Sequence, residues 1–307
     1  MVAEELEETG AGIASGPRSM LSRIADITLT SPPDSARMTE FGERDPEAAV
    51  DAAALAELVH VASLHHDDVM DARTRRGAPS VNALWGDSVA VLAGNWLLAK
   101  AARLAAELGP EILRLQARVT NRLVSGQIRE LTGAAPGEDP LSHYFAVVAG
   151  KSASLIAMAL QSGAIRTGTP AHTAEALAEY GEHLGTAFQI ADDILDVTAA
   201  SEVLGKEQGK DLAVGVAGLP VLLALADDGP AADELRELLT AAGQGRAGAT
   251  AVPRAVALLR GGGALAEAGA MMRGRLARAR GALDGLPEGP ATRVLYALCD
   301  VVADRDH

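Results

Sequence analysis

Aromatic residues and cysteine are scarce in this chain. Among its 307 residues there are 3 Phe, 3 Tyr and 2 Trp, and Cys299 is the one cysteine. A lone cysteine excludes an intramolecular disulfide and any zinc site built from several cysteines, and it is consistent with a reducing cytoplasm. Since hydrophobic residues make up 48% of the chain and aromatics only 3%, alanine, leucine and valine must supply the core.

Positive charge and long hydrophobic runs are also lacking. The 27 basic residues are outnumbered by 41 acidic ones, and the net charge of −14 disfavours nucleic acid and leaves no basic patch for anionic lipid. The N-terminus has no signal-peptide pattern, and the longest apolar stretch, Val89 to Ala106, is interrupted by Asn95, Lys100 and Arg103. We therefore expect a cytoplasmic protein with no nucleic-acid partner and no stable membrane span.

Runs of alternating β-branched residues are absent too, whereas the abundant alanine and leucine are strong helix formers. The fold class is therefore predicted to be all-α, with an acidic, disordered tail at residues 1–16 and a single all-α domain at 17–307. Helices are expected at about 18–29, from 46 into the first acidic cluster, 81–108, 110–132, 140–166, 170–198, 217–226, 231–242, 249–283 with a break at 261–263, and 288–303. Loops are expected at 30–45 and 204–211.

Two stretches of the form DDxxD stand out within these apolar helical segments. The first runs from Asp67 to Asp71 and the second from Asp192 to Asp196. Residues four apart on a helix share a face, so the outer acids of each stretch point the same way. One such run is usually a solvated face, but two runs embedded in apolar helix need a cation to offset their repulsion and desolvation. Mg²⁺ fits, because it takes oxygen ligands and completes its shell with a substrate phosphate. Two such faces, opposed across a cavity, would hold a diphosphate through shared metal ions.

Basic residues near the clusters offer partners for a diphosphate. Arginine suits phosphate because its planar fork donates two parallel hydrogen bonds. The candidates are Arg73, Arg75 and Arg76 after the first cluster, Lys206 and Lys210 after the second, and Lys151 within a long apolar segment.

With these motifs, the chain resembles the trans-isoprenyl diphosphate synthases, also called polyprenyl synthetases, over roughly residues 45 to 225. Paired DDxxD motifs in tandem are highly specific. The matching stretches are His60–Asp71, Arg75–Pro79, Phe188–Asp196, Gly205-Lys206, Asp211-Leu212, Lys151-Ser152, and Gly126-Gln127 with Glu130.

The resemblance implies a large helical bundle around a deep central cavity, of the isoprenoid synthase type, usually as a homodimer. It implies Mg²⁺ as cofactor and prenyl diphosphates as substrates. By the same resemblance, the metal ligands are Asp67, Asp71 and Asp192, while Asp68, Asp193 and Asp196 hold metal-bound waters and orient the ligands. Arg75, Lys151 and Lys206 would grip the allylic diphosphate. His60 and Arg76 would serve isopentenyl diphosphate, with Gln189 close by.

The chain also departs from the family pattern. In the expected Gly-Lys-x-x-Arg-Pro element, Pro17 stands in place of lysine and Met20 in place of arginine. The other departures are Asn82, Asn95, Ala199-Ala200 and Val216. Several of these losses fall on the side that binds isopentenyl diphosphate.

Three activities therefore compete. The first is chain elongation to a medium or long trans-polyprenyl diphosphate, favoured by the small residues Ala62 and Ser63 before the first cluster, by the few aromatics, and by the retained His60 and Arg76. The second is a class I terpene synthase that needs no isopentenyl diphosphate. The third is a non-catalytic partner subunit, which would have no need of two complete acidic clusters. We rank elongation narrowly ahead of cyclisation and the partner role last.

Overall fold

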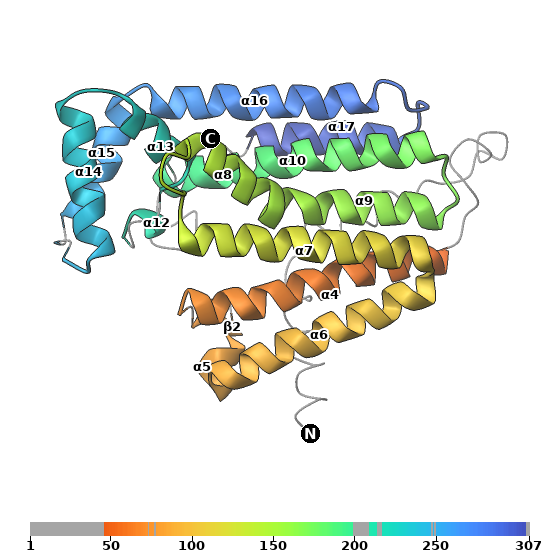
Figure 1. The fold of residues 1–307 in the computed structure, drawn as a ribbon. Coiled ribbons are helices and arrows are strands. Elements are labelled where there is room, and N and C mark those ends of the chain that lie inside the picture. The colour runs from red at the N-terminus through yellow and green to blue at the C-terminus, as the bar shows by residue number, and fades with distance from the viewer. Residues whose placement is uncertain are drawn as a thin grey trace. The chain divides into compact units, whose positions relative to one another are not determined.

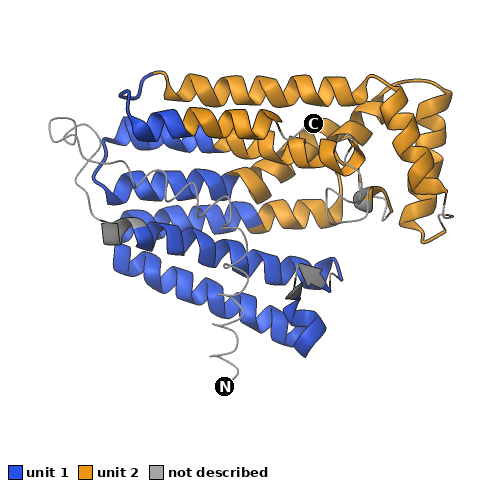
Figure 2. Cartoon of the chain, turned by 180° about the vertical axis from the view of Figure 1, so that it is seen from behind, with its two compact units in different colours: residues 1–123, 154–181, 285–294 blue, residues 124–153, 182–284, 295–307 orange. Residues whose placement is uncertain are grey.

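The computed structural model describes residues 46–72, 74–76, 78–198, 209–213, 217–246, 248 and 250–304. These residues form two compact units (Figure 2). Unit 1 takes the described residues up to Leu123, together with Ser154–Gly181 and Gly285–Val294, and unit 2 takes the remainder. The predicted tail at 1–16, the predicted helix at 18–29 and the expected loop at 30–45 lie outside the described residues, and a single domain at 17–307 stays a prediction.

Unit 1 is organised around the long helix α4, which packs against α6 and α9 (Figure 1). Ala52, Leu55, Ala56, Val59 and Ala62 are buried and repeat with the three- and four-residue spacing of one helical face. The elements of unit 1 are α4 (Pro46–Met70), β1 (Arg75–Arg76), β2 (Ala78–Pro79), α5 (Val81–Trp85), α6 (Asp87–Leu108), α9 (Ser154–Arg166), and parts of α7 (Pro110–Thr132), α10 (Ala171–Thr198) and α17 (Pro290–Ala303).

Unit 2 consists of the described residues within 124–153, 182–284 and 295–304. Its C-terminal helices enclose a buried cluster made of Val197, Leu212, Val221, Leu235, Ala255, Val256 and Leu259. The elements of unit 2 are α8 (Pro140–Val148), the π-helical turn η1 (Ala149–Ala153), α12 (Lys210–Ala213), α13 (Leu219–Ala226), α14 (Pro230–Gly243), α15 (Ala251–Gly261), α16 (Ala264–Leu283), and the remaining parts of α7, α10 and α17.

The predicted all-α class is confirmed, with four local corrections. The helix expected at 81–108 is interrupted at Gly86, whose φ of 84° lies in the left-handed region that favours glycine. The segment expected at 140–166 contains the π-turn η1. Residues 210–213 form the short helix α12 where a loop was expected, and residues 75–79 include a two-residue antiparallel pairing of Arg75 with Pro79.

Two helical stretches pass a membrane-span test based on length and composition alone. They are α6 and residues 140–166. In the most apolar 18-residue stretch of each, 28% and 61% of the residues are buried, respectively. A core helix of a soluble protein passes the same test, so the second stretch is explained by its burial. The expected lack of a membrane span stays a prediction.

Candidate functional site

The first acidic cluster lies at the C-terminal end of α4, in unit 1. Asp67 and Asp68 are buried, with 8% and 3% of their surface exposed, and Asp71 is exposed in the turn that follows the helix. The backbone N–H of Asp71 donates to the carbonyl of Asp67 at 2.8 Å, so the helical repeat extends to the last acid. Asp67 and Asp71 therefore lie one turn apart on one face, as predicted. His60, seven residues before Asp67, shares that face and is half-buried.

Residues of the following segments contact the C-terminal end of α4 at the backbone of Asp68 and at the side chain of His66. Asn82 Nδ2 donates to the carbonyl of Asp68 at 3.0 Å, and its Oδ1 accepts from Ser80 Oγ at 2.5 Å. His66 Nε2 lies 3.3 Å from the carbonyl oxygen of Val91, and a Cβ at Gly94 would overlap the His66 ring. Asn82, a departure from the family pattern, is thus a bridge that fixes the end of α4.

The predicted diphosphate-binding arginines follow directly on a small hairpin rather than a loop. Ala72 has a φ of 47°, which ends the helical turn, and the backbone N–H of Ser80 donates to the carbonyl of Thr74 at 3.0 Å to close the reversal. Arg75 and Arg76 form β1, so the backbone places both a few residues beyond the acids.

The second acidic cluster lies near the C-terminal end of α10, in unit 2. Asp192 and Asp196 are half-buried, whereas Asp193 is only 8% exposed. Asp193 Oδ2 accepts from the Tyr144 hydroxyl at 2.7 Å and from the backbone N–H of Leu219 at 2.8 Å. Its Oδ1 accepts from Gln189 Nε2 at 3.0 Å.

The same network extends to the π-turn. Gln189 Oε1 accepts from Ser152 Oγ at 2.9 Å, so the predicted substrate-binding Gln189 links η1 to Asp193. Burial and then the negative charge of Asp193 raise the pKa of Tyr144 well above its ordinary value, so its hydroxyl stays a donor. Sequence reasoning missed Tyr144, and the available signal was an aromatic seven residues before Lys151 in a chain with few aromatics.

Lys151 on η1 is not the isolated lysine that its apolar segment suggests. Its Nζ lies 2.5 Å from Glu130 Oε2 of α7, in an ion pair that is partly exposed on both sides. A Cβ at Gly126 would come within 3.0 Å of the backbone nitrogen of Lys151, so glycine allows α7 and η1 to approach this closely. Gln127 beside it is 6% exposed, and its side-chain amide finds no hydrogen-bond partner among the described residues.

Both clusters occupy the carbonyl end of a long helix, where the helix dipole is negative. Neither α4 nor α10 carries a basic residue in its own last turn. At α10, Arg260 of α15 compensates by donating to the carbonyls of Thr198 at 2.6 Å and Val197 at 3.2 Å. Carboxylates at such helix ends favour a bound cation.

The donor chemistry fits a hard divalent cation. Within the described residues, no three acidic, histidine or cysteine side chains already converge as a metal cage. Mg²⁺ does not need one, because it takes one or two carboxylates and fills its other positions with water and phosphate oxygens. The oxygen-only donors of each cluster suit that ion.

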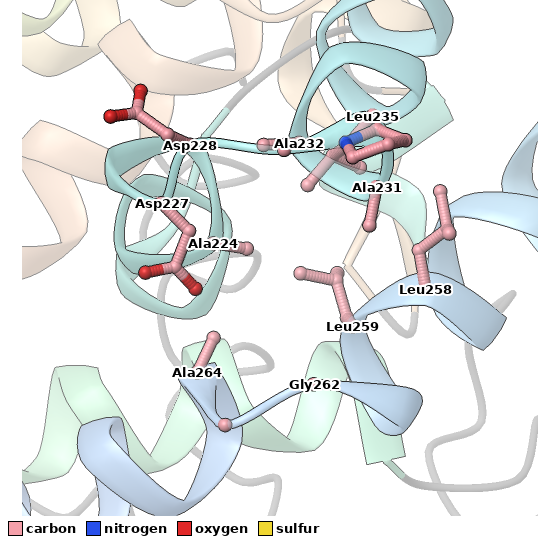
Figure 3. A pocket seen from close by; sticks show the side chains of 13 residues that line it. Ala224, Asp227, Asp228, Ala231, Ala232, Leu235, Leu258, Leu259, Gly262 and Ala264 are labelled. Carbon is pink, nitrogen blue, oxygen red and sulfur yellow. The ribbon is translucent and has the colours of Figure 1, made fainter.

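A cavity of about 300 Å³ lies elsewhere in unit 2, between the ends of α13, α14, α15 and α16 (Figure 3). Its walls are mostly apolar, including Ala224, Leu235, Leu258 and Leu259. Asp227 and Asp228 are the charged side chains that line it, and its lining includes no basic residue. It therefore lacks the cations that a diphosphate site needs.

Within unit 2, the structure brings Gln189 and Asp193 into contact and places Lys151 beside Ser152, which contacts Gln189. Lys206 lies outside the described residues. The first cluster belongs to unit 1 and the second to unit 2, so the convergence of Asp67 and Asp192 on one cavity stays a prediction.

Comparisons with known proteins agree with the motifs. A model of the family described as Polyprenyl synthetase matches residues 31–258. The chain is 44% identical to nonaprenyl diphosphate synthase of Mycobacterium tuberculosis, over 87% of this chain and 79% of that protein. It is 34% identical to heptaprenyl diphosphate synthase component 2 of Geobacillus stearothermophilus, over 87% and 82%.

Solved structures show the same likeness. A decaprenyl diphosphate synthase from Rhodobacter capsulatus superposes with a TM-score of 0.78 at 30% identity, covering 94% of this chain and 85% of that one. A polyprenyl synthase from Caulobacter crescentus, complexed with calcium and isoprenyl diphosphate, superposes with a TM-score of 0.80 at 29% identity, covering 99% and 95%.

Proposed function

The chain belongs to the polyprenyl synthetase family, and on that premise we propose that it is a prenyltransferase that condenses an allylic prenyl diphosphate head-to-tail with isopentenyl diphosphate. The observation that carries this proposal is the pair of DDxxD clusters, each at the negative end of a long helix. Relatives that match most of the chain are named as prenyl diphosphate synthases, which supports elongation over cyclisation.

The metal in this proposal is a divalent cation, specifically Mg²⁺, with Asp67, Asp71 and Asp192 as its ligands. The calcium in two similar structures supports divalent-metal binding by those proteins. When bound, such ions neutralise the charge that develops on the departing pyrophosphate. The two clusters bind the same diphosphate in this proposal, which requires them to face one cavity.

Basic residues of this chain would share that task. Lys151, held by Glu130, supplies a positive charge beside the second cluster's hydrogen-bond network. Arg75 and Lys206 complete the grip on the allylic diphosphate, and His60 and Arg76, with Gln189 close by, serve isopentenyl diphosphate. Arginine forks and fixed lysines suit phosphate oxygens for the reasons of geometry and charge given above.

The product in this proposal is of medium or long chain length. The relatives named above make nonaprenyl and heptaprenyl chains by their names, and an octaprenyl diphosphate synthase of Haemophilus influenzae is 33% identical over 84% of this chain. Five and four residues before Asp67, Ala62 is fully buried and the Ser63 hydroxyl donates to the carbonyl of its own helix at His60. Neither side chain is large enough to block a growing prenyl tail.

We further propose a homodimer that forms through α6 and α5, in a cytoplasmic protein. Leu92 is 66% exposed and Leu84 51% exposed, with Val91 and Trp85 at 39% on the same segment. Exposed apolar residues on the consecutive helices α5 and α6 favour a covered surface, and a second copy would bury them. Replacing Leu92 with lysine should give a monomer by light scattering, whereas lysine at the exposed Val301 of α17 should not. An unchanged oligomeric state for the Leu92 variant would contradict the dimer surface.

The function is tested with purified protein, Mg²⁺, and C10, C15 or C20 allylic diphosphates, with and without labelled isopentenyl diphosphate. Label incorporated into a longer diphosphate supports elongation. Hydrocarbon or alcohol made without the second substrate would instead establish the cyclase. Failure of both reactions, in a protein that binds Mg²⁺ and pyrophosphate normally, would point to the partner-subunit role.

A further inference from the structure

We infer that Tyr144 is a positioning residue of the second acidic cluster: it fixes Asp193 as an internal anchor, and this anchor orients Asp192 toward metal. The inference rests on the proposed function and assigns Asp193 a different task from its neighbour. Asp192 is half-buried and would bind the ion, whereas Asp193 holds the protein together behind it.

The carboxylate of Asp193 is hydrogen-bonded to donors from the protein itself. Oδ2 accepts from Tyr144 at 2.7 Å and from the Leu219 N–H at 2.8 Å, and Oδ1 accepts from Gln189 at 3.0 Å. A carboxylate offers about four acceptor positions, and three are used here by protein donors. With at least three of these positions taken by protein donors, Asp193 is poorly placed to hold metal-bound water as well.

Asp193 also caps the N-terminus of the helix α13. Leu219 is the first residue of α13, and the preceding N-cap residue, Gly218, has no side chain that could cap the first N–H groups of the helix. Asp193 supplies the missing acceptor from another helix, and its negative charge suits the positive end of α13. A Cβ at Gly218 would lie 3.0 Å from Asp193 Oδ2, so glycine leaves room for this contact.

Ring contacts restrict the position of the Tyr144 side chain. Its ring packs edge-on against Phe145, with centroids 5.2 Å apart, and the Arg275 guanidinium of α16 lies 5.0 Å from the Phe145 ring centroid. Two of the chain's eight aromatics are therefore used side by side to fix one hydroxyl.

Together these contacts tie α8, η1, α10 and α13 to one buried carboxylate. Because Asp192 is the preceding residue on α10, locking Asp193 also sets the direction in which the Asp192 side chain leaves the helix. The same network reaches Ser152, the neighbour of Lys151 on the π-turn, and π-turns are frequent at functional sites. The network thus positions an acid and a base for the same ligand.

The test is Tyr144→Phe in the full chain, which removes one hydroxyl and keeps the ring. Calorimetry with Mg²⁺ and inorganic pyrophosphate should show about tenfold weaker binding, and turnover should need more Mg²⁺ for half-maximal rate. The matched control is Tyr296→Phe, which deletes a tyrosine–aspartate hydrogen bond of 3.0 Å that is exposed and joins Tyr296 of α17 to Asp284 at the end of α16. Because that bond is exposed, its loss should lower thermal stability less than Tyr144→Phe does, without changing either binding or Mg²⁺ dependence. Unchanged binding and Mg²⁺ dependence for Tyr144→Phe would overturn the inference.

A second pair of variants separates anchoring from metal binding. In Asp193→Asn the amide oxygen can still accept from Tyr144 and Leu219, and Gln189 can turn its amide to accept from the new NH₂ group, with Ser152 accepting in turn. Asp193→Asn should therefore weaken pyrophosphate binding less than about tenfold, and Asp192→Asn about a hundredfold or more. Equal losses would overturn the anchor role. If the unaltered protein binds no Mg²⁺–pyrophosphate at all, the proposed function itself fails, which is a distinct result.

Discussion

The two acidic clusters share a sequence pattern but are held in place differently. At the first, neighbouring residues act on the helix end: Asn82 donates to the carbonyl of Asp68, and the chain then reverses into the hairpin. At the second, donors from α8, α10 and α13 converge on the carboxylate of Asp193. The comparison shows that equivalent positions of a repeated motif are contacted by different neighbours.

The clusters also differ in donors that contact the carbonyl groups at the C-terminal ends of α4 and α10. The carbonyl end of α10 receives a guanidinium from Arg260, while the carbonyl of Asp68 receives the neutral amide of Asn82. A neutral donor offsets less of the negative helix dipole than a cation does.

The largest expected effect comes from removing a metal ligand on either side of the comparison. Asp67→Ala and Asp192→Ala should each lower kcat by about 10²–10³-fold or more, since each removes a ligand from the charge-stabilising metal site. Circular dichroism should show an intact helical fold. Asp228→Ala, at the exposed rim of the separate cavity, is the control and should retain activity. Near-normal rates for either ligand variant would refute its assigned role.

A smaller effect should distinguish the two modes of support. Gly218→Ala pushes a Cβ against the Asp193 carboxylate, so turnover should fall about tenfold with a raised Mg²⁺ requirement. Gly94→Ala pushes against the His66 ring instead, and should cost about 1–3 kcal/mol of stability with a smaller change in Mg²⁺ dependence. Titration of Mg²⁺ in activity assays and thermal unfolding check both. Equal shifts in Mg²⁺ requirement would erase the distinction between the clusters.

The π-turn should show a weaker effect that is specific to substrate. Gly126→Ala places a Cβ 3.0 Å from the backbone nitrogen of Lys151 and 3.2 Å from Gly150, which must displace the turn. We expect a KM for the allylic diphosphate raised about threefold to tenfold, because Lys151 moves with the turn. Gly281→Ala, in α16 with open space around it, should leave KM unchanged and slightly raise stability. A normal KM for Gly126→Ala would remove Lys151 from the diphosphate site.

Much of the helical framework was predictable because local signals mark it. The break between α15 and α16 falls where three consecutive glycines predict it, and α4 and α8 begin at prolines. The interruption at Gly86 and the π-turn were missed. The π-turn depends on the close approach of α7 at Gly126, which no local pattern reveals.

The parts of the candidate site that consist of residues close together in the sequence were predictable. The acidic clusters and Lys151 could be identified from the sequence; the clusters lie at the ends of expected helices, and Lys151 lies on the π-turn within its expected helical segment. The link from Tyr144 to Asp193 spans 49 positions, and the pairing of Lys151 with Glu130 spans 21. Such partners depend on tertiary packing, so sequence periodicity alone could not reveal them.

The smallest expected effect is on thermal stability, from removing an ion pair of unit 2 that lies outside the acidic cluster. Arg254 donates to both oxygens of Glu234 at 2.6 Å, and these hydrogen bonds lower the pKa of Glu234. A carboxyl with a lowered folded-state pKa stabilises the protein above its unfolded pKa, and that contribution is lost as pH falls through the folded pKa. Because both side chains are well exposed to solvent, Arg254→Met should change the Tm by about 2 °C or less at neutral pH, and by less still in acid. A change in Mg²⁺ requirement would contradict its purely structural role.

The central claim, that both clusters bind the same metal-bound diphosphate, is tested most directly by a double-mutant cycle on binding. Calorimetry with Mg²⁺ and pyrophosphate would compare Asp67→Asn, Asp192→Asn and the double variant, which weaken the ligands while keeping their size. We predict strong coupling, with the double variant losing little more affinity than either single variant, because each substitution already disrupts the shared ions. Losses in binding free energy that simply add would show two independent sites and contradict the account.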